Sequence, residues 1–342
     1  GREGLNGLKQ IKDFRTILFD MDGVLTSEQG YWNCAALTVY ELLHSRRYFG
    51  KQELDIPKLA GQTSKLRDWY FFGDRTIVAL KNLGVNSNWD LAYLVLAGFA
   101  GLDHAEGEAV FRHFEKVGLQ PPELYDHAKE LLQKRYPAMD CERNGELWKT
   151  LQEVFDEWEY GDQYYELAKG IKPRQSGKPG FIRQELPMHS VEETKRLLDT
   201  LRSWNITLGV GTGRPAFELW VPLRKWGLDQ YFAPEHCVTY DDIAASSQRL
   251  GRFLAKPNPF TFWKAALGKA YPEEKIVAGA FDGMPPEDIL VVGDAGADIL
   301  AAKAMGAKFA AVLTGVNGLS ARQYFEQQGA DYIFDTVLEL AG

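Results

Sequence analysis

Two aspartates follow directly after a short apolar run in the stretch ILFDMDGVLT. The run ILF has the composition of a strand that is covered on both faces. Asp20 and Asp22 are two residues apart at its end, so both side chains can face one small site. Leaving two buried carboxylates unpaired would be costly. The pair therefore raises the question of what offsets its charge.

Two carboxylates this close need a cation, or one of them must hold its proton. A hard divalent cation such as Mg²⁺ meets the first condition because it takes oxygen ligands and keeps water and substrate oxygens in its shell. The second condition suits general acid/base work. A nucleophilic aspartate beside a protonatable one can transfer a phosphoryl group through an aspartyl-phosphate. Taken alone, however, Asp20 and Asp22 fit a turn-forming acid pair beside Gly23 equally well.

Three further polar segments lie at or just beyond the ends of other apolar runs. In an open parallel α/β sheet, ligands bind outside the carboxyl ends of the strands, so these segments can converge. They are Thr212-Gly213-Arg214 after LGVG, Lys256-Pro257 in LAKPNP, and Gly293-Asp294 to Asp298 after ILVV.

These segments contain the groups that phosphoryl transfer needs. Lys256 can supply positive charge, and the Thr212 hydroxyl and the Gly213 backbone N–H can supply hydrogen-bond donors. Asp294 can complete a metal site, and Asp298 can steady Lys256 or a metal-bound water. Each residue also has an ordinary interpretation: a strand-end hydroxyl for Thr212, a solvated lysine for Lys256, and a helix cap for Asp298.

The elements that must position these residues are visible as an alternation of short β-rich runs and helical stretches in the C-terminal half. This pattern is typical of a parallel sheet built from βαβ units. Ser190 and Glu193 predict a capping box at the start of a helix over 190–204, and Asp241 and Asp242 predict a second helix cap. The predicted strands after ILF are ITLGVGTG, ILVVGD, KFAAVLTG and ADYIFD.

Residues 28–188 have a different character, with helical patterns such as WDLAYLVLAGFA and many aromatic residues. We interpret them as a mostly helical insertion between the first strand and the rest of the sheet. The insertion closes with the stretch 169–188, which is rich in Gly and Pro and carries five basic residues before Glu185. This stretch is expected to be a linker or mobile loop, either solvated or able to grip an anionic substrate.

The 342 residues are 45% hydrophobic and 25% charged, which is typical of a soluble globular protein. A formal net charge of −8 argues against a nucleic-acid partner. The three cysteines show no CxxC spacing, which favours a reducing compartment. No apolar run reaches the roughly 18 to 20 residues of a membrane span, and the N-terminus lacks the apolar core of a signal peptide. We expect a cytoplasmic protein with no membrane partner, and the sequence does not indicate its oligomeric state.

Taken in order, the four polar segments resemble the motifs of the haloacid dehalogenase superfamily of phosphatases and phosphomutases. The matching stretches are FDMDGVLT, VGTGR, KPNP and VVGDAGAD. The resemblance implies that Asp20 is the nucleophile and a Mg²⁺ ligand. It implies that Asp22 is the general acid/base, with its main-chain carbonyl on the metal, and that Asp294 is the other protein carboxylate on Mg²⁺.

The resemblance also implies roles for the remaining residues. Thr212 and Lys256 are expected to hold the phosphoryl oxygens, with Gly213 beside them, and Asp298 is expected to be an acidic partner close to the metal or to Lys256. One departure is Ser27, which stands where many relatives carry an acid, as in DGTLVDS. The dehalogenases lack the second aspartate and the phosphonate hydrolases have Ala there, so Asp22 favours phosphate esters.

The fold class implied is α/β, with a Rossmann-like doubly wound parallel sheet as core and an inserted, mostly α-helical cap. We assign residues 1–27 and 189–342 to the catalytic core and 28–188 to the large helical cap. The expected function is Mg²⁺-dependent hydrolysis of a small phosphorylated metabolite through an aspartyl-phosphate. Two alternatives stay open: a phosphomutase resembling β-phosphoglucomutase, and a catalytically idle binding protein of the same fold. The sequence does not identify the substrate.

Overall fold

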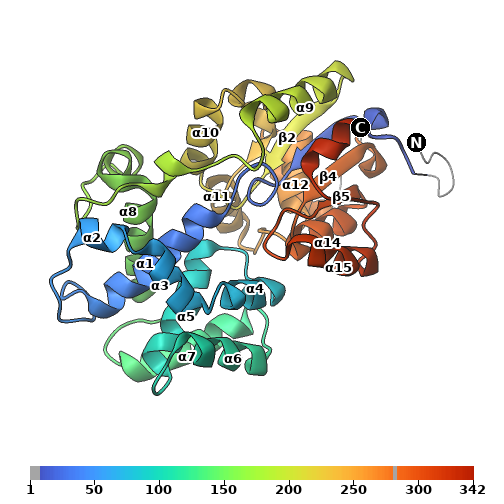
Figure 1. Cartoon of the computed structure of the whole chain (residues 1–342). Coiled ribbons are helices and arrows are strands. Elements are labelled where there is room, and N and C mark those ends of the chain that lie inside the picture. The colour runs from blue at the N-terminus through green and yellow to red at the C-terminus, as the bar shows by residue number, and fades with distance from the viewer. Residues whose placement is uncertain (1–7, 280–282) are drawn as a thin grey trace. The chain divides into compact units, whose positions relative to one another are not determined.

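The chain folds into two compact units (Figure 1). The structure, a computed structural model, describes residues 8–279 and 283–342. One unit, here called the core unit, runs up to Ser27 and resumes over Leu186–Gly342, while the insertion unit covers Glu28–Glu185. Within the described ranges, no helix combines the length and the apolar character that a membrane crossing requires.

A six-stranded parallel sheet forms the middle of the core unit, in the order β3-β2-β1-β4-β5-β6. The first strand, β1 (Thr16–Phe19), is entirely buried between β2 (Thr207–Gly211) and β4 (Ile289–Gly293). The chain then builds outward on both sides of β1, which is the doubly wound arrangement, so the predicted Rossmann-like α/β fold class is confirmed. The outer strands are β3 (Cys237–Val238), β5 (Lys308–Val312) and β6 (Tyr332–Phe334).

Helices cover both faces of this sheet. Successive side chains of β1 point to opposite faces, so Ile17 and Phe19 join one hydrophobic cluster and Leu18 joins the other. The first cluster includes residues of α9 (Val191–Ser203) and α10 (Ala216–Lys225). The second includes residues of α11 (Tyr240–Leu250), α12 (Phe260–Leu267), α13 (Glu273–Ala278), α14 (Gly296–Met305) and α15 (Arg322–Gln327).

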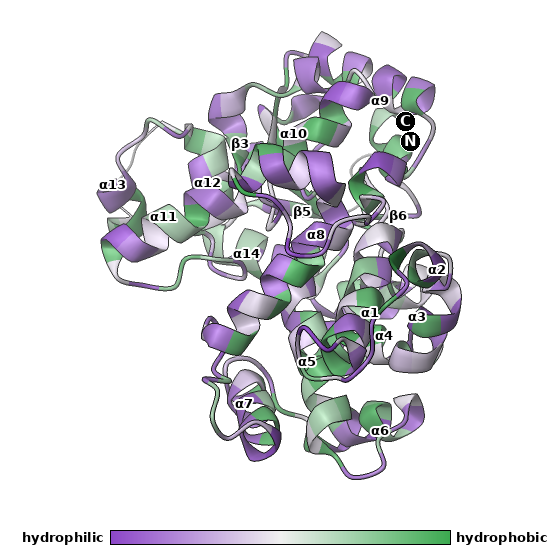
Figure 2. Ribbon diagram, turned by 90° about the vertical axis from the view of Figure 1, so that its left-hand side faces the viewer, coloured by the Kyte–Doolittle hydropathy of each residue, from purple (hydrophilic) through white to green (hydrophobic). Residues whose placement is uncertain are grey.

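Polar side chains fix where these helices begin. Ser190 caps α9 as predicted, because its side chain accepts a hydrogen bond from the backbone N–H of Glu193. Asp242 forms a capping box with the residue before α11, and Asp241 accepts a hydrogen bond from the backbone N–H of Ala216 at the start of α10. Figure 2 shows hydrophilic and hydrophobic segments alternating along α9, as expected for a helix with one buried face.

The insertion unit is helical, as predicted. Its most buried helix is α5 (Asn88–Gly101), in which ten successive residues from Trp89 are buried. A helix that is apolar all round belongs in a core, so α5 organises this unit. The other helices are α1 (Gln29–His44), α2 (Ile56–Ala60), α3 (Thr63–Phe71), α4 (Arg75–Asn82), α6 (Gly107–Val117), α7 (Glu123–Arg135) and α8 (Glu146–Lys169).

The basic stretch after α8 is anchored rather than free. The Lys178 side chain is fully buried, with its Nζ 2.7 Å from a Glu41 oxygen and 2.6 Å from a Glu157 oxygen. Its Nζ also lies 4.8 Å from the ring centroid of Trp158. Lys178 is therefore neither a solvated loop residue nor available to bind an anionic substrate. Two other basic residues of the stretch pair with acids of α8, as Lys169 with Asp156 and Arg174 with Glu153.

Replacing Lys178 by Ala is expected to destabilise the protein by about 3 to 5 kcal/mol, because it leaves two buried glutamates without their cation. Denaturant unfolding monitored by tryptophan fluorescence measures this change. Lys172→Ala, an exposed lysine of the same stretch, is the matched control and should stay within about 0.5 kcal/mol. Equal small effects for both variants would show that the buried ion pairs do not stabilise the fold.

Candidate active site

Asp20 lies where β1 ends, at the carboxyl edge of the sheet. Its backbone N–H donates to the carbonyl of Val292 at 2.9 Å, which extends the pairing of β1 with β4 by one residue. Its Oδ1 accepts a hydrogen bond from the backbone N–H of Met21 at 2.7 Å. The strand and the following turn therefore fix both the position and the orientation of the carboxylate.

Two other carboxylates meet Asp20 at this edge. Asp294 follows β4 directly and Asp298 lies in the first turn of α14, and one oxygen of each lies within 4.8 Å of one from Asp20. Asp298 does not cap its helix, which excludes the ordinary interpretation of that residue. The structure thus brings together three of the acids that the sequence singled out.

Glycines make room for the Asp294 carboxylate. A Cβ placed on Gly23 would lie 2.1 Å from Asp294 Oδ2, and a Cβ on Gly315 would lie 2.4 Å from the same atom. Gly23 also has φ of +77°, which side chains disfavour. A side chain at either glycine would therefore occupy the space of the Asp294 carboxylate.

Lys256 supplies the positive charge among these acids. Its Nζ donates to Asp298 Oδ1 at 2.9 Å and lies 3.3 Å from Asp20 Oδ1. The residue is 7% exposed and packs over the ring of Phe262, so it is not the solvated lysine of the ordinary interpretation. Burial alone would lower the pKa of Lys256, but Asp20 and Asp298 outweigh it and raise that pKa, so the ammonium stays charged.

The electrostatics of the cluster leave it short of positive charge. Burial, and then the neighbouring charge of Asp298, raise the pKa of Asp20 well above its usual value; Asp294 adds to the rise and Lys256 opposes it. Among the described residues of the cluster, one ammonium faces three carboxylates, which leaves an excess of two negative charges when all three are ionised. Asp298 Oδ2 is moreover buried and has no hydrogen-bond partner within the described residues. An all-oxygen site with this charge fits a divalent cation such as Mg²⁺.

Thr212 and Gly213 lie at the end of the neighbouring strand β2. The Thr212 N–H donates to the carbonyl of Val238 at 3.0 Å, and its hydroxyl oxygen accepts from the backbone N–H of Arg214, also at 3.0 Å. Thr212 is buried, whereas Gly213 is exposed. Both therefore occupy the carboxyl edge beside β1, but neither belongs to the acid cluster.

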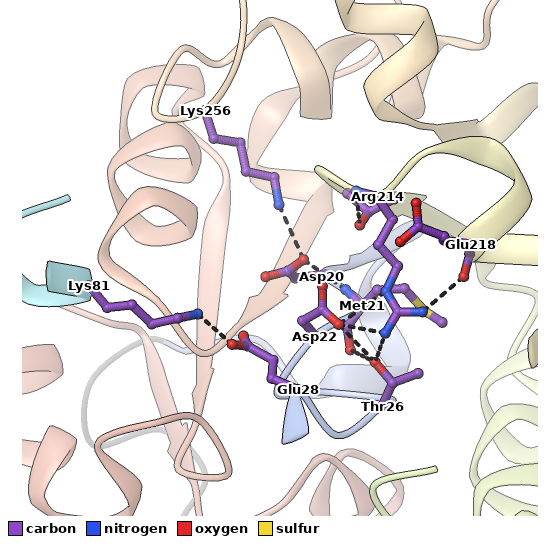
Figure 3. Close-up of polar contacts among 10 residues, drawn as sticks. Asp20, Met21, Asp22, Thr26, Glu28, Lys81, Arg214, Glu218 and Lys256 are labelled. Atoms are coloured by element: carbon purple, nitrogen blue, oxygen red, sulfur yellow. Dashed lines mark hydrogen bonds and ion pairs between the residues drawn. The ribbon is translucent and has the colours of Figure 1, made fainter. Parts of the chain in front are cut away.

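Asp22 has a different environment from Asp20, because it pairs with Arg214 (Figure 3). Arg214 donates from Nη2 at 2.6 Å and from Nε at 3.0 Å, both to Asp22 Oδ1. The same Nη2 lies 2.9 Å from the Thr26 hydroxyl, which is 3.2 Å from Asp22 Oδ1. The two aspartates of the opening stretch thus face different cations, Lys256 for Asp20 and Arg214 for Asp22.

Arg214 is the residue whose part in the site the sequence did not reveal. It is only 3% exposed, and its Nη1 donates to the carbonyl of Glu218 at 2.8 Å. An arginine after a strand is ordinarily a surface residue. The sequence feature that could have identified Arg214 is its position in the segment Thr212-Gly213-Arg214, two residues beyond a predicted phosphate-binding hydroxyl.

Comparisons with known proteins place this chain in a family. A family model described as haloacid dehalogenase-like hydrolase matches residues 14–306. A crystal structure solved as a Northeast Structural Genomics Consortium target is 30% identical, with a TM-score of 0.73, and the match covers 95% of this chain and 97% of that one. No curated protein matches the chain.

Other solved structures are less similar to this chain. A protein from Thermotoga maritima, provisionally assigned as β-phosphoglucomutase, is 16% identical over 96% of both chains, with a TM-score of 0.44. A provisionally assigned phosphoglycolate phosphatase from Lactobacillus delbrueckii subsp. bulgaricus is 16% identical over 96% of this chain and 97% of that one, with a TM-score of 0.46. These values are too low for either activity to bear on this protein.

Proposed function

This chain belongs to the haloacid dehalogenase-like hydrolase family, and we propose that it is a Mg²⁺-dependent phosphatase of a small phosphorylated metabolite. The observation that carries the proposal is the cluster of Asp20, Asp294, Asp298 and Lys256 at the carboxyl edge of the sheet. It combines an oriented carboxylate, a buried ammonium and an excess of negative charge. A cation and a phosphoryl group together would satisfy all three.

Asp20 is the proposed nucleophile. One of its oxygens forms a bond to phosphorus while the ester P–O bond breaks, and the leaving oxygen takes a proton from Asp22 to depart as an alcohol. Lys256, with the Thr212 hydroxyl and the Gly213 N–H, stabilises the charge on the phosphoryl oxygens. When bound, Mg²⁺ supplies further positive charge at these oxygens. Asp20, Asp294 and the main-chain carbonyl of Asp22 would hold it.

The second half of the reaction returns the enzyme to its starting state. Asp22, now a carboxylate, removes a proton from a water molecule, and that water attacks the phosphorus of the aspartyl-phosphate. The bond between phosphorus and the Asp20 oxygen breaks, which releases inorganic phosphate and regenerates both carboxyl groups. Asp298 keeps Lys256 in place through their 2.9 Å hydrogen bond. The insertion unit is proposed to act as the cap that selects the leaving group.

Hydrolysis of an aryl phosphate with and without Mg²⁺ tests the proposal. We expect turnover only when Mg²⁺ is present, and we expect the phosphoryl group to be transferred to water. Chase experiments with ³²P-labelled enzyme separate the phosphatase from the phosphomutase, because a mutase passes the label to a sugar phosphate instead. Absence of turnover on a broad panel of phosphate esters at saturating Mg²⁺ would reject the proposal.

Binding of Mg²⁺ is expected to stabilise the protein more as the pH rises. The raised pKa of Asp20 means that the ion-free folded protein holds this proton more tightly than the unfolded chain does. The resulting stability is fully present when the pH is below the ordinary aspartate pKa of about 3.9. It is lost as the pH rises through the raised pKa. The cation needs the carboxylate and offsets that loss. At ~100-fold excess over its Kd, Mg²⁺ should add about 2.7 kcal/mol.

Thermal unfolding between about pH 5 and about pH 8, with and without Mg²⁺, measures this effect. In Asp20→Asn, ion-free stability should fall less over that range than in the wild type, and the Mg²⁺ shift should shrink. A Mg²⁺ shift of the same size at every pH in the wild type would contradict the assignment of Asp20 as a ligand.

A further inference from the structure

The contacts of Asp22 are concentrated on one of its two oxygens. In the described part of the chain, Arg214 Nη2, Arg214 Nε and the Thr26 hydroxyl all approach Oδ1, at 2.6, 3.0 and 3.2 Å. The side chain of Asp22 is 19% exposed, so it is neither sealed in the interior nor free to rotate in solvent. Oδ2 is therefore the oxygen that remains available to a substrate.

Arg214 is itself fixed by hydrogen bonds at both its guanidinium and its backbone N–H. The Arg214 side chain is 2% exposed, its Nη1 donates to the Glu218 carbonyl in α10, and the Arg214 backbone N–H donates to the Thr212 hydroxyl oxygen. Two donors of this fixed, planar group converge on Asp22 Oδ1, which holds that oxygen in place as a flexible lysine ammonium would not. The arginine thus connects the end of β2 and the start of α10 to the turn after β1.

We propose that Arg214 is a positioning residue that fixes the rotamer of Asp22, so that Oδ2 alone exchanges protons with the leaving group and the attacking water. This inference rests on the proposed phosphatase function. Oδ1 already accepts two hydrogen bonds from Arg214 and lies 3.2 Å from the Thr26 hydroxyl, so the proton that Asp22 gives to the leaving oxygen is carried by Oδ2. The proton that Asp22 later removes from water returns to the same atom, which closes the cycle.

The role predicts an effect that depends on the leaving group. Phosphorylation of Asp20 by an alkyl phosphate needs a proton from Asp22, whereas 2,4-dinitrophenolate leaves without one. For Arg214→Gln, kcat/KM with ethyl phosphate should fall by about 10²-fold or more, the size of a lost general acid. With 2,4-dinitrophenyl phosphate, kcat/KM should change by less than about 5-fold, because this ratio reports the steps up to leaving-group release.

A test in the Asp22→Asn background distinguishes a positioning role of Arg214 from a purely structural one. In Asp22→Asn, the further change Arg214→Gln should have little effect on ethyl phosphate, since there is no acid left to position. Thr26→Val removes one contact to Oδ1 and keeps the arginine, so it should show the same leaving-group dependence more weakly. Arg202→Gln, an exposed arginine of the core unit, should leave both esters unchanged.

The outcomes distinguish this inference from the function on which it rests. Equal losses on both esters, or a loss that persists in the Asp22→Asn background, would mean that Arg214 only supports the fold, and would overturn the inference. Full activity of Arg214→Gln on ethyl phosphate would overturn it as well. If the wild-type protein hydrolyses neither ester in Mg²⁺, then the phosphatase itself is wrong.

Discussion

Replacing Asp20 by Asn is expected to lower kcat by at least about 10⁴-fold, because loss of a nucleophile removes the covalent route entirely. The amide has nearly the shape of the carboxylate and can keep the backbone hydrogen bond from Met21. The fold should therefore survive. Removing one charge from a cluster with excess negative charge should even stabilise the ion-free protein.

Steady-state kinetics with an aryl phosphate at saturating Mg²⁺ measures this loss. Asp229→Asn is a suitable control, because Asp229 lies in a cleft with Thr207, at the other end of β2 from the site. That variant should keep wild-type kinetics. Turnover by Asp20→Asn within about 10-fold of wild type would show that Asp20 is not the nucleophile.

Replacing Lys256 by Met should lower kcat/KM by about 10² to 10³-fold, the size expected when one preorganised charge is lost from a reacting group. The change also leaves Asp20 and Asp298 without the ammonium that lies between them. In the absence of Mg²⁺ the variant should accordingly lose about 3 to 5 kcal/mol of stability. Lys256→Arg should recover little, because a forked guanidinium does not fit a place shaped for a compact ammonium.

Lys264 offers a matched control for this variant. It is a second buried lysine of the core unit and pairs with Glu273 at 2.8 Å, outside the acid cluster. Lys264→Met should also lose stability, although less because Glu273 keeps its ion pair with Arg249, and its folded fraction should keep kcat/KM. If both variants lose activity in proportion to stability, Lys256 acts through the fold and not on the phosphoryl group.

Much of the core unit follows from local patterns in the sequence. Runs such as ILF and ILVVG read as buried strands because both of their faces are covered, and each ends in an acid at the carboxyl edge. Once the two strands are predicted to pair in parallel, Asp20 and Asp294 are predicted to lie at the same edge of the sheet. The strand β3 is not visible in this way, because its two residues, Cys237 and Val238, are too few to give a period.

The remaining features depend on contacts between residues far apart in the chain. The Arg214 and Asp22 pair spans 192 positions, and the Lys178 and Glu41 pair joins a Gly/Pro-rich stretch to a helix that lies far before it. Composition marks Arg214 and Lys178 as surface residues, since charged side chains are rarely buried unless they are paired. Only the fold shows that partners are present, so sequence patterns cannot identify such residues.

Chemical trapping of the phosphorylated enzyme tests the central claim most directly. Borohydride reduces an acyl phosphate to the alcohol, so an aspartyl-phosphate at position 20, quenched during turnover, becomes homoserine and is located by peptide mass spectrometry. We predict this conversion at Asp20 in the wild-type protein with substrate and Mg²⁺, and its loss when either is omitted. Steady turnover with no conversion at Asp20, or with conversion at another aspartate, would contradict the proposed function.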